Sequence, residues 1–158
     1  MRTVEDESGR RYLLVKQSKE AGRVRDPTTG EERHLPTEEL TVVEGESPLE
    51  TAASGVPSAV RRVLTAVHDD RSLGLLIEIV DRGRMSIRTL LAEYDLCESD
   101  LHGLLAEFRA AGLLEETRVA GERGYAPTDR AIDGIGILLK DRRLGEFEPD
   151  PTDETHRH

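Results

Sequence analysis

Sulfur and aromatic side chains are scarce in this sequence, which has one Cys, no Trp, two Phe and three Tyr. A single Cys excludes an internal disulfide and a cysteine-based metal cluster. With so few aromatic residues the core has to be built from Leu, Ile, Val and Ala, which favours helices over an aromatic-rich sheet. The length of 158 residues suffices for one main domain with a small appendage.

Long apolar runs are absent as well. The longest, residues 73–80, contains Glu78 and is far shorter than the roughly 20 residues of a membrane span. No charged start followed by an apolar run marks a signal peptide. We therefore expect a cytoplasmic protein without a membrane partner.

Lys is nearly excluded, since only three of the 22 basic residues are Lys, against 32 acidic residues and a net charge of −10. This balance is similar to that of proteins from salt-accumulating halophiles. Molar salt screens the self-repulsion of such a surface within a few ångströms, and the carboxylates keep it hydrated. The composition predicts a halophilic protein, with an acidic mesophilic protein as the alternative.

Residues 1–43 carry the pattern of a small β-meander. Residues 11–16 and 23–25 are β-like, and a turn with Pro27 and Gly30 leads into a third strand at 31–35. Three short strands bury too little to be stable alone, so we expect them to pack on the main domain or on a second copy. Residues 44–57, rich in Gly, Ser, Pro and Glu, are predicted to be a linker.

After Pro57 the apolar spacing becomes helical and predicts one domain over residues 58–143. Four amphipathic segments follow one another, and the second is apolar on more than one face. Gly83 ends that second segment, Ser86 is placed to cap the third, and Gly112 is placed to end the fourth. The apolar stripes are Val60, Val63, Leu64 and Val67; Leu73, Leu76, Ile77 and Val80; Ile87, Leu90, Leu91 and Tyr94; and Leu101, Leu104, Leu105 and Phe108.

Two short helices after a buried one predict a helix-turn-helix, and the next residues predict a wing. Residues 113–119 are β-compatible, 120–124 form a turn, and 125–127 return as a strand. Thr128 caps a last helix through Leu139 that is apolar nearly all round. We interpret it as an oligomer contact or as a helix buried against the N-terminal sheet. Residues 144–158 are predicted to be a disordered acidic tail. The fold class is α+β: a mainly α winged helix-turn-helix domain with a small N-terminal β-sheet.

Residues 58–139 resemble the winged-helix transcriptional regulators of archaea and bacteria, the superfamily with the ArsR, MarR and PadR-like groups. The resemblance rests on the helix-turn-helix spacing of residues 87–112, on FRAAGLL at 108–114 and on GYAPT at 124–128. Here Pro127 stands where the superfamily usually has Leu, and Ile132 stands near an expected Gly. The resemblance implies a haloarchaeal type of regulator that binds double-stranded DNA, although winged helices also serve as protein-interaction modules.

In such regulators the second helix of the motif enters the major groove and the wing touches the DNA backbone. The resemblance maps the base-reading face onto Ser99, Asp100, His102 and Gly103, with Ala106 and Glu107 beside them. It also implies phosphate contacts, for which the candidates are Arg84, Arg88, Arg109, Arg118 and Arg123. The acidic face departs from the basic one of many relatives. For any single Arg the alternative is a solvated pair with a neighbouring acid.

Cys97 precedes the predicted recognition helix, where relatives place a Ser or Thr cap. A thiol there feels the helix dipole, so Cys97 is a candidate redox or thiophilic-metal sensor. The alternative is a small buried residue.

Enzyme signatures are missing: the sequence has no phosphate-binding Gly-Lys-Ser/Thr loop, no His-Glu-x-x-His and no nucleophile elbow. His68-Asp69-Asp70 is better explained as an acidic helix end than as a metal site. We therefore expect no enzyme, no cofactor and no metal. The hypothesis is a homodimeric transcriptional regulator bound to double-stranded DNA. Its rival is a protein-interaction winged helix, an accessory subunit of a replication, transcription or chromosome-maintenance complex.

Overall fold

The computed structural model describes residues 1–140, which divide into two compact units. The first unit ends at Ser58 and the second begins at Ala59. The predicted tail at 144–158 and the last three residues of the predicted winged-helix domain lie outside the described residues.

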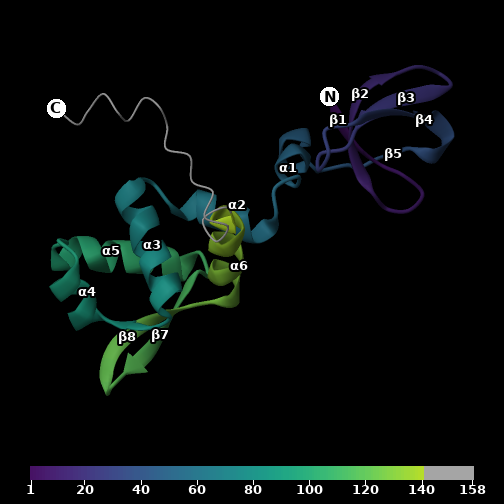
Figure 1. Ribbon diagram of the computed structural model, residues 1–158. Helices are drawn as coiled ribbons and strands as arrows, with labels where there is room; N and C mark the ends of the chain where they lie inside the picture. The colour runs from purple at the N-terminus through teal and green to yellow at the C-terminus, as the bar shows by residue number, and fades with distance from the viewer. Residues whose placement is uncertain (141–158) are drawn as a thin grey trace. The chain divides into compact units, whose positions relative to one another are not determined.

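The first unit is an antiparallel five-stranded sheet in the order β4-β3-β2-β1-β5 (Figure 1). Three of its strands lie where the sequence predicts them. The other two, β1 and β5, are only four and two residues long and were missed. The elements are β1 (Arg2–Glu5), β2 (Arg11–Gln17), β3 (Ala21–Arg25), β4 (Glu32–Pro36), the 3₁₀ turn η1 (Thr37–Glu39) and β5 (Thr41–Val42).

Both faces of this sheet carry buried residues. Val4, Tyr12, Leu14 and Val24 form an apolar cluster on one face, and Leu35, Leu40 and Val42 pack against it. The unit therefore has an apolar core of its own, whereas the sequence predicts three strands that bury too little to be stable alone.

The predicted linker at 44–57 is wrong, because it contains helix α1 (Pro48–Ala53). The Ser-Pro pair that resembles a linker starts this helix: Ser47 is the N-cap, accepts a hydrogen bond from the Leu49 amide, and is followed by Pro at the first helical position. The hydroxyl of buried Thr51 lies 2.6 Å from that of Thr3 in β1. Helix α1 is thereby joined to the sheet.

The second unit holds the predicted helices and the wing. Its helices are α2 (Ser58–Ala66), α3 (Asp70–Arg82), α4 (Ile87–Glu93), α5 (Glu98–Ala110) and α6 (Asp129–Leu138). Its strands are β6 (Met85–Ser86), β7 (Leu114–Val119) and β8 (Glu122–Pro127), in the sheet order β6-β8-β7. Residues 1–140 are α+β, but the predicted dominance of helix is not confirmed, because eight strands form in them.

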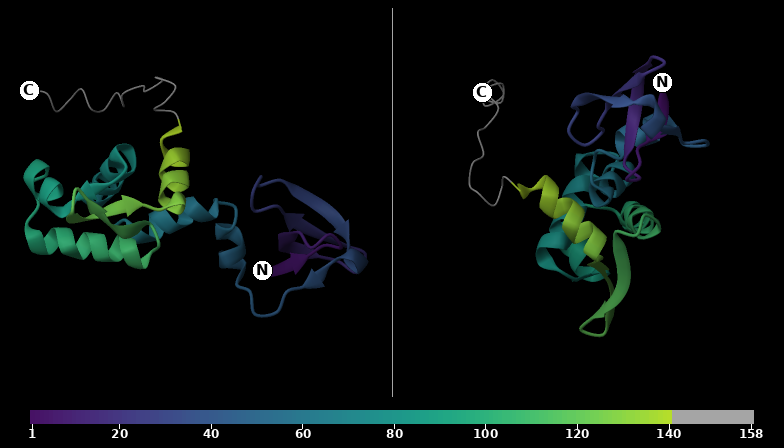
Figure 2. Two further views of the ribbon diagram at one scale, coloured as in Figure 1. Left: turned by 90° about the horizontal axis from the view of Figure 1, so that it is seen from below. Right: turned by 90° about the vertical axis from the view of Figure 1, so that its right-hand side faces the viewer.

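The wing is an antiparallel hairpin of β7 and β8 that projects beyond the helices of its unit (Figure 2). Its turn is only Ala120-Gly121, with φ values of 50° and 82°. Two positive φ angles are those of a tight hairpin turn whose twist matches that of the strands. The predicted five-residue turn is therefore wrong, since Glu122 and Arg123 belong to β8. The hairpin is held by the unpredicted strand β6, in which Met85 pairs with Tyr125.

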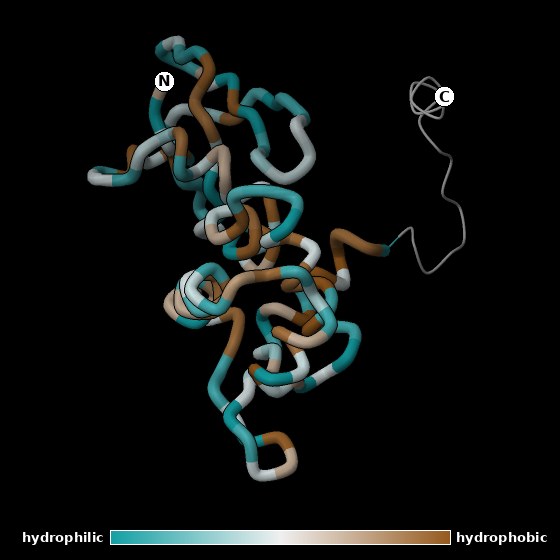
Figure 3. Tube along the Cα trace, turned by 90° about the vertical axis from the view of Figure 1, so that its left-hand side faces the viewer, coloured by the Kyte–Doolittle hydropathy of each residue, from teal (hydrophilic) through white to brown (hydrophobic). Residues whose placement is uncertain are grey.

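One apolar core joins α2, α3, α4, α5, α6 and the wing. Leu76, Ile79, Leu90, Leu105 and Phe108 are among its fully buried side chains. Helix α6 turns Ala131, Gly134 and Ile135 into this core. Three apolar residues of α6 remain exposed, namely Ile132, Ile137 and Leu138. The hydropathy colouring in Figure 3 shows how apolar the C-terminal part of this helix is.

Candidate nucleic-acid interface

Helices α4 and α5 form the helix-turn-helix, and local sequence sets their ends. Ser86 caps α4 by accepting a hydrogen bond from the Thr89 amide, as predicted. Helix α5 follows Cys97, and Gly112, with φ of 74°, ends the turn after it. Leu101, Leu105 and Phe108 are fully buried, which leaves the opposite side of α5 exposed between the wing and α3.

On the wing side of α5 lies a groove of about 540 Å³, here called the wing groove. It is open, and its walls come from α5 and β8. Helix α5 contributes two bases and two small residues that leave room for a ligand backbone. The lining residues are His102, Ala106, Arg109, Ala110, Arg123 and Tyr125.

One carboxylate forms ion pairs with both arginines of the wing groove. An oxygen of Glu116 in β7 lies 2.6 Å from an Arg123 nitrogen and 3.1 Å from an Arg109 nitrogen. The hydrogen bond from Arg123, helped by the charge of Arg109, lowers the pKa of Glu116. Glu116 therefore stays ionised at neutral pH. The groove has a basic lining whose charge is partly offset at its edge.

The remaining arginine candidates lie around the wing. Arg88 on α4 is 3.3 Å from Glu122 across the gap to β8. Arg118 donates to the Gly121 carbonyl in the wing turn. Arg84, between α3 and β6, is exposed and forms no ion pair within residues 1–140. Three of the five candidates, Arg88, Arg109 and Arg123, are thus paired with acids. This is the pairing that the alternative interpretation of these arginines expects.

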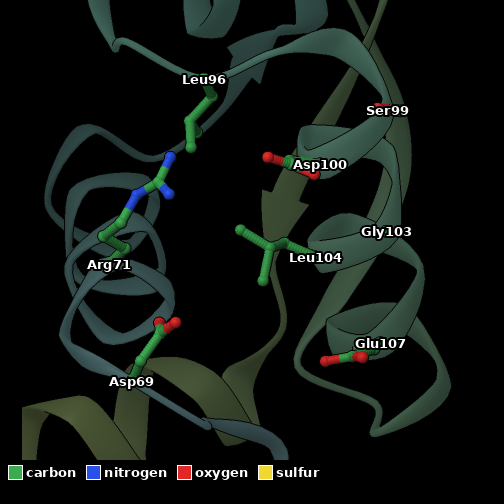
Figure 4. Close-up of a pocket in the computed structure, with 8 residues that line it drawn as sticks. All are labelled: Asp69, Arg71, Leu96, Ser99, Asp100, Gly103, Leu104 and Glu107. Carbon is green, nitrogen blue, oxygen red and sulfur yellow. The ribbon is translucent and has the colours of Figure 1, made fainter.

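The other exposed residues of α5 face away from the wing. Ser99, Asp100 and Gly103 line an open cleft of about 340 Å³, here called the α3 cleft. Across the cleft, Arg71 of α3 runs toward Leu96 (Figure 4) and donates a hydrogen bond to the Asp95 carbonyl oxygen. The further lining residues are Asp69, Leu96, Leu104 and Glu107.

The α3 cleft is the acidic flank of α5. Glu107 lies 3.1 Å from His68, and Asp69 caps α3 by accepting from the Ser72 amide, which lowers the pKa of Asp69. The predicted base-reading residues therefore do not form one surface. His102 lies in the wing groove, 3.7 Å from Glu98 on its own helix, whereas Ser99, Asp100 and Gly103 lie in the α3 cleft.

Tyr125 and Arg71 were not predicted to take part, whereas Glu116 is one of the acids that neighbour Arg123 in the sequence, and it pairs with Arg123 as the alternative interpretation expects. The hydroxyl of Tyr125 lies 3.4 Å from both Glu116 and Arg123, so the tyrosine completes the wall of the groove. Glu116 of β7 is paired directly with Tyr125 of β8 in the ladder. The alternation of side chains along β7 therefore places Glu116 on the same face of the hairpin as Tyr125. No spacing in the sequence connects Arg71 to α5.

Cys97 occupies the N-cap position of α5, but its side chain makes no capping hydrogen bond. It is exposed, so the interpretation as a buried residue is wrong. Its sulfur lies 3.4 Å from the Ser99 hydroxyl.

Within residues 1–140, no three His, Cys, Asp or Glu side chains gather in a way that would hold a metal ion. None of the helices described there has the length and apolar character needed to cross a membrane.

The comparison with protein families matches residues 1–139 to the model of DUF7346, a family of unknown function. The chain belongs to this family. Both units are included in the DUF7346 match, so the small sheet and the winged-helix arrangement occur together as one family unit. No curated protein matches the chain.

Among solved structures, an ArsR-like transcriptional regulator from Rhodococcus sp. RHA1 is similar to it. The two are 22% identical over 56% of this chain and 88% of that chain, with a TM-score of 0.42.

Proposed function

We propose that the protein is a cytoplasmic, DNA-binding transcriptional regulator that presents α5 and the wing to double-stranded DNA. The observation that carries this proposal is the wing groove, where a helix-turn-helix and a hairpin place His102, Arg109 and Arg123 around one open surface. A helix beside a hairpin matches the way winged helices engage the major groove and the flanking backbone.

The chemistry of α5 fits close contact with a groove. The exposed side of α5 carries small residues, Ala106 and Ala110 in the wing groove and Ser99 and Gly103 in the α3 cleft. Small side chains let the helix backbone approach base edges and phosphates. His102 adds a hydrogen-bonding ring, and the wing arginines are suited to phosphate oxygens. Asp100 and Glu107 oppose binding on the other flank. The acidic, lysine-poor composition favours a salt-accumulating host, in which bulk cations screen these carboxylates.

Binding of the full chain to duplexes recovered by chromatin immunoprecipitation in its host tests the proposal. Because two phosphate contacts are lost, the Arg109→Gln/Arg123→Gln variant is expected to bind about tenfold more weakly at 0.1 M salt, with a shallower salt dependence. The matched control, Arg62→Gln/Arg130→Gln, removes the same charge from exposed positions outside the wing groove. Equal affinities of the two variants would contradict the assignment of the groove.

We also propose that the regulator is a homodimer joined through α2, α3 and α6. These helices frame an open apolar groove of about 330 Å³ without a charged lining residue. Nearby, Leu64, Ile132, Ile137 and Leu138 are 44–57% exposed, an unusual density of bare aliphatic surface. The groove is lined by Val63, Leu64, Val67, Leu73, Ile77, Ile135, Leu138 and Leu139.

The dimer is tested by light scattering of the full chain during gel filtration. Leu64→Glu and Leu138→Glu are expected to shift the mass from two chains to one, because each buries a charge in an apolar interface. Leu49, which is 81% exposed in the first unit, provides the control variant Leu49→Glu. A wild-type chain that is monomeric at 100 μM would overturn this proposal.

The α3 cleft favours a second candidate function, a protein-interaction winged helix. Asp69, Asp100 and Glu107 give this cleft an acidic lining suited to a basic protein segment. Under this hypothesis a protein partner co-purifies with the wild-type chain and is lost from the Asp100→Asn/Glu107→Gln variant. Chromatin immunoprecipitation of the wild-type chain is then expected to enrich no promoter.

A further inference from the structure

A row of basic side chains crosses three strands of the first unit. In the antiparallel ladder Lys16 of β2 is paired with Arg23 of β3, and Arg23 is paired with His34 of β4. Val24, the next residue of β3, belongs to the apolar cluster, so Arg23 and His34 lie on the opposite face of the sheet. A register shift in β2 between Leu14 and Lys16 brings Lys16 onto that same face. Arg25, two residues beyond Arg23, lies on the same face as the row.

The row is electrostatically unfavourable for the fold. Like charges directly opposite one another on neighbouring strands destabilise a sheet. One acid relieves it: Glu32 lies 3.6 Å from Nε of Arg23, too far for a hydrogen bond. That Nε is buried and finds no hydrogen-bond acceptor among residues 1–140.

We propose that Lys16, Arg23 and His34 form a phosphate-binding surface for the backbone of duplex DNA. The neighbouring strands are about 4.8 Å apart, so the row spans roughly 10 Å. On one DNA strand a phosphate recurs about every 3.4 Å of helix axis, so a row of this length can face more than one phosphate. The basic side chains are therefore placed to contact neighbouring phosphates of the backbone. The inference rests on the proposed function, since it assigns this second surface to the same ligand.

The chemistry favours the backbone of a duplex over single-stranded nucleic acid. Proteins that hold single strands stack the bases on exposed aromatic rings. The aromatic residue of these strands, Tyr12, is only 2% exposed and lies on the other face, where Arg10 and Arg33 flank its ring. With charge but no stacking surface, the row is suited to sequence-independent phosphate contacts.

The test is the salt dependence of DNA binding by the full chain. For a nonspecific duplex of 20 base pairs, Lys16→Gln/Arg23→Gln is expected to reduce the slope of log Kobs against log salt by about 2. The control Arg2→Gln/Arg62→Gln removes the same charge elsewhere and is expected to leave the slope within about 0.3 of the wild type. An unchanged slope in Lys16→Gln/Arg23→Gln would overturn the inference.

Further measurements separate this surface from misfolding and from the wing. Lys16→Gln relieves a like-charge pair and is expected to keep or raise the urea midpoint, which distinguishes a lost contact from a lost fold. In the Arg109→Gln/Arg123→Gln background, residual binding that still depends on Lys16 and Arg23 would support the sheet surface even where the wing groove fails. A variant defect seen with heparin or single-stranded RNA, but not with duplex DNA, would reject the assigned ligand.

Discussion

Replacing Glu116 by Gln is expected to raise the affinity of the full-length chain for duplex DNA about tenfold at 0.1 M salt. Glu116 now holds Arg109 and Arg123 at 3.1 and 2.6 Å, so a phosphate has to compete with it for both cations. The amide of Gln keeps the shape of the side chain and removes the competing charge. Fluorescence anisotropy with a labelled duplex measures the change, together with a steeper dependence on salt.

The neighbouring variant Glu115→Gln is the matched control, because it makes the same change of charge at an exposed position in the same strand. It is expected to change the affinity less than threefold. If both variants bind alike, the wing groove does not hold the phosphates. If neither variant nor wild type binds DNA at any salt concentration, the protein-interaction hypothesis becomes the better one.

Lowering the pH to mildly acid values is not expected to raise the affinity for duplex DNA as Glu116→Gln does. Since the pKa of Glu116 is lowered, its carboxylate persists through mildly acid pH. The stabilising ion pairs with Arg123 and Arg109 are present above the pKa of the unfolded chain and are lost only as pH falls through the lowered folded value. The gain in affinity of Glu116→Gln over wild type is therefore expected to stay constant between pH 6 and 8.

The helices of the second unit were predictable because each buries one stripe at helical spacing. Caps at Ser86 and Thr128 then fixed where α4 and α6 begin. The short strands were not predictable in this way. Strand β6 has two residues and exists because Met85 pairs with Tyr125, which is distant in sequence. The wing turn was overestimated because Gly124 looks like a turn residue. Its lack of a side chain instead lets the backbone of Met85 approach closely.

The candidate site was predictable as a helix face but not as two surfaces. Periodicity identifies the exposed residues of α5 and cannot say what faces them. The wing groove requires β8 beside one flank of α5, and the α3 cleft requires Arg71 and Asp69 beside the other. Charge pairing has the same limit, since Arg109 and Glu116 meet only after the chain has turned from α5 into β7. Tertiary packing therefore decides which of the predicted arginines is paired with an acid, and which acidic side chain faces the DNA.

The same substitution at two glycines of α6 is expected to change stability in opposite directions. A β-carbon at Gly134 would lie 2.7 Å from the Ala59 carbonyl oxygen and 2.9 Å from a methyl of Val63, whereas one at Gly136 meets nothing within 4 Å. Gly134→Ala therefore forces α6 away from α2 and is expected to lower the free energy of unfolding by about 1–3 kcal/mol. Gly136→Ala adds helix propensity without a clash and is expected to raise it by about 0.5–1 kcal/mol.

Urea unfolding followed by circular dichroism measures both variants, at several protein concentrations so that the contribution of dimerisation is separated from that of the fold. Each variant is the control of the other, because both gain the same methyl group and the same helix propensity. A stabilised Gly134→Ala would mean that α2 and α6 do not pack at the distance described. Since α2 and α6 also frame the apolar groove, Gly134→Ala is further expected to weaken the homodimer. Gly136→Ala, which changes only the helix propensity, is expected to leave the dimer unchanged.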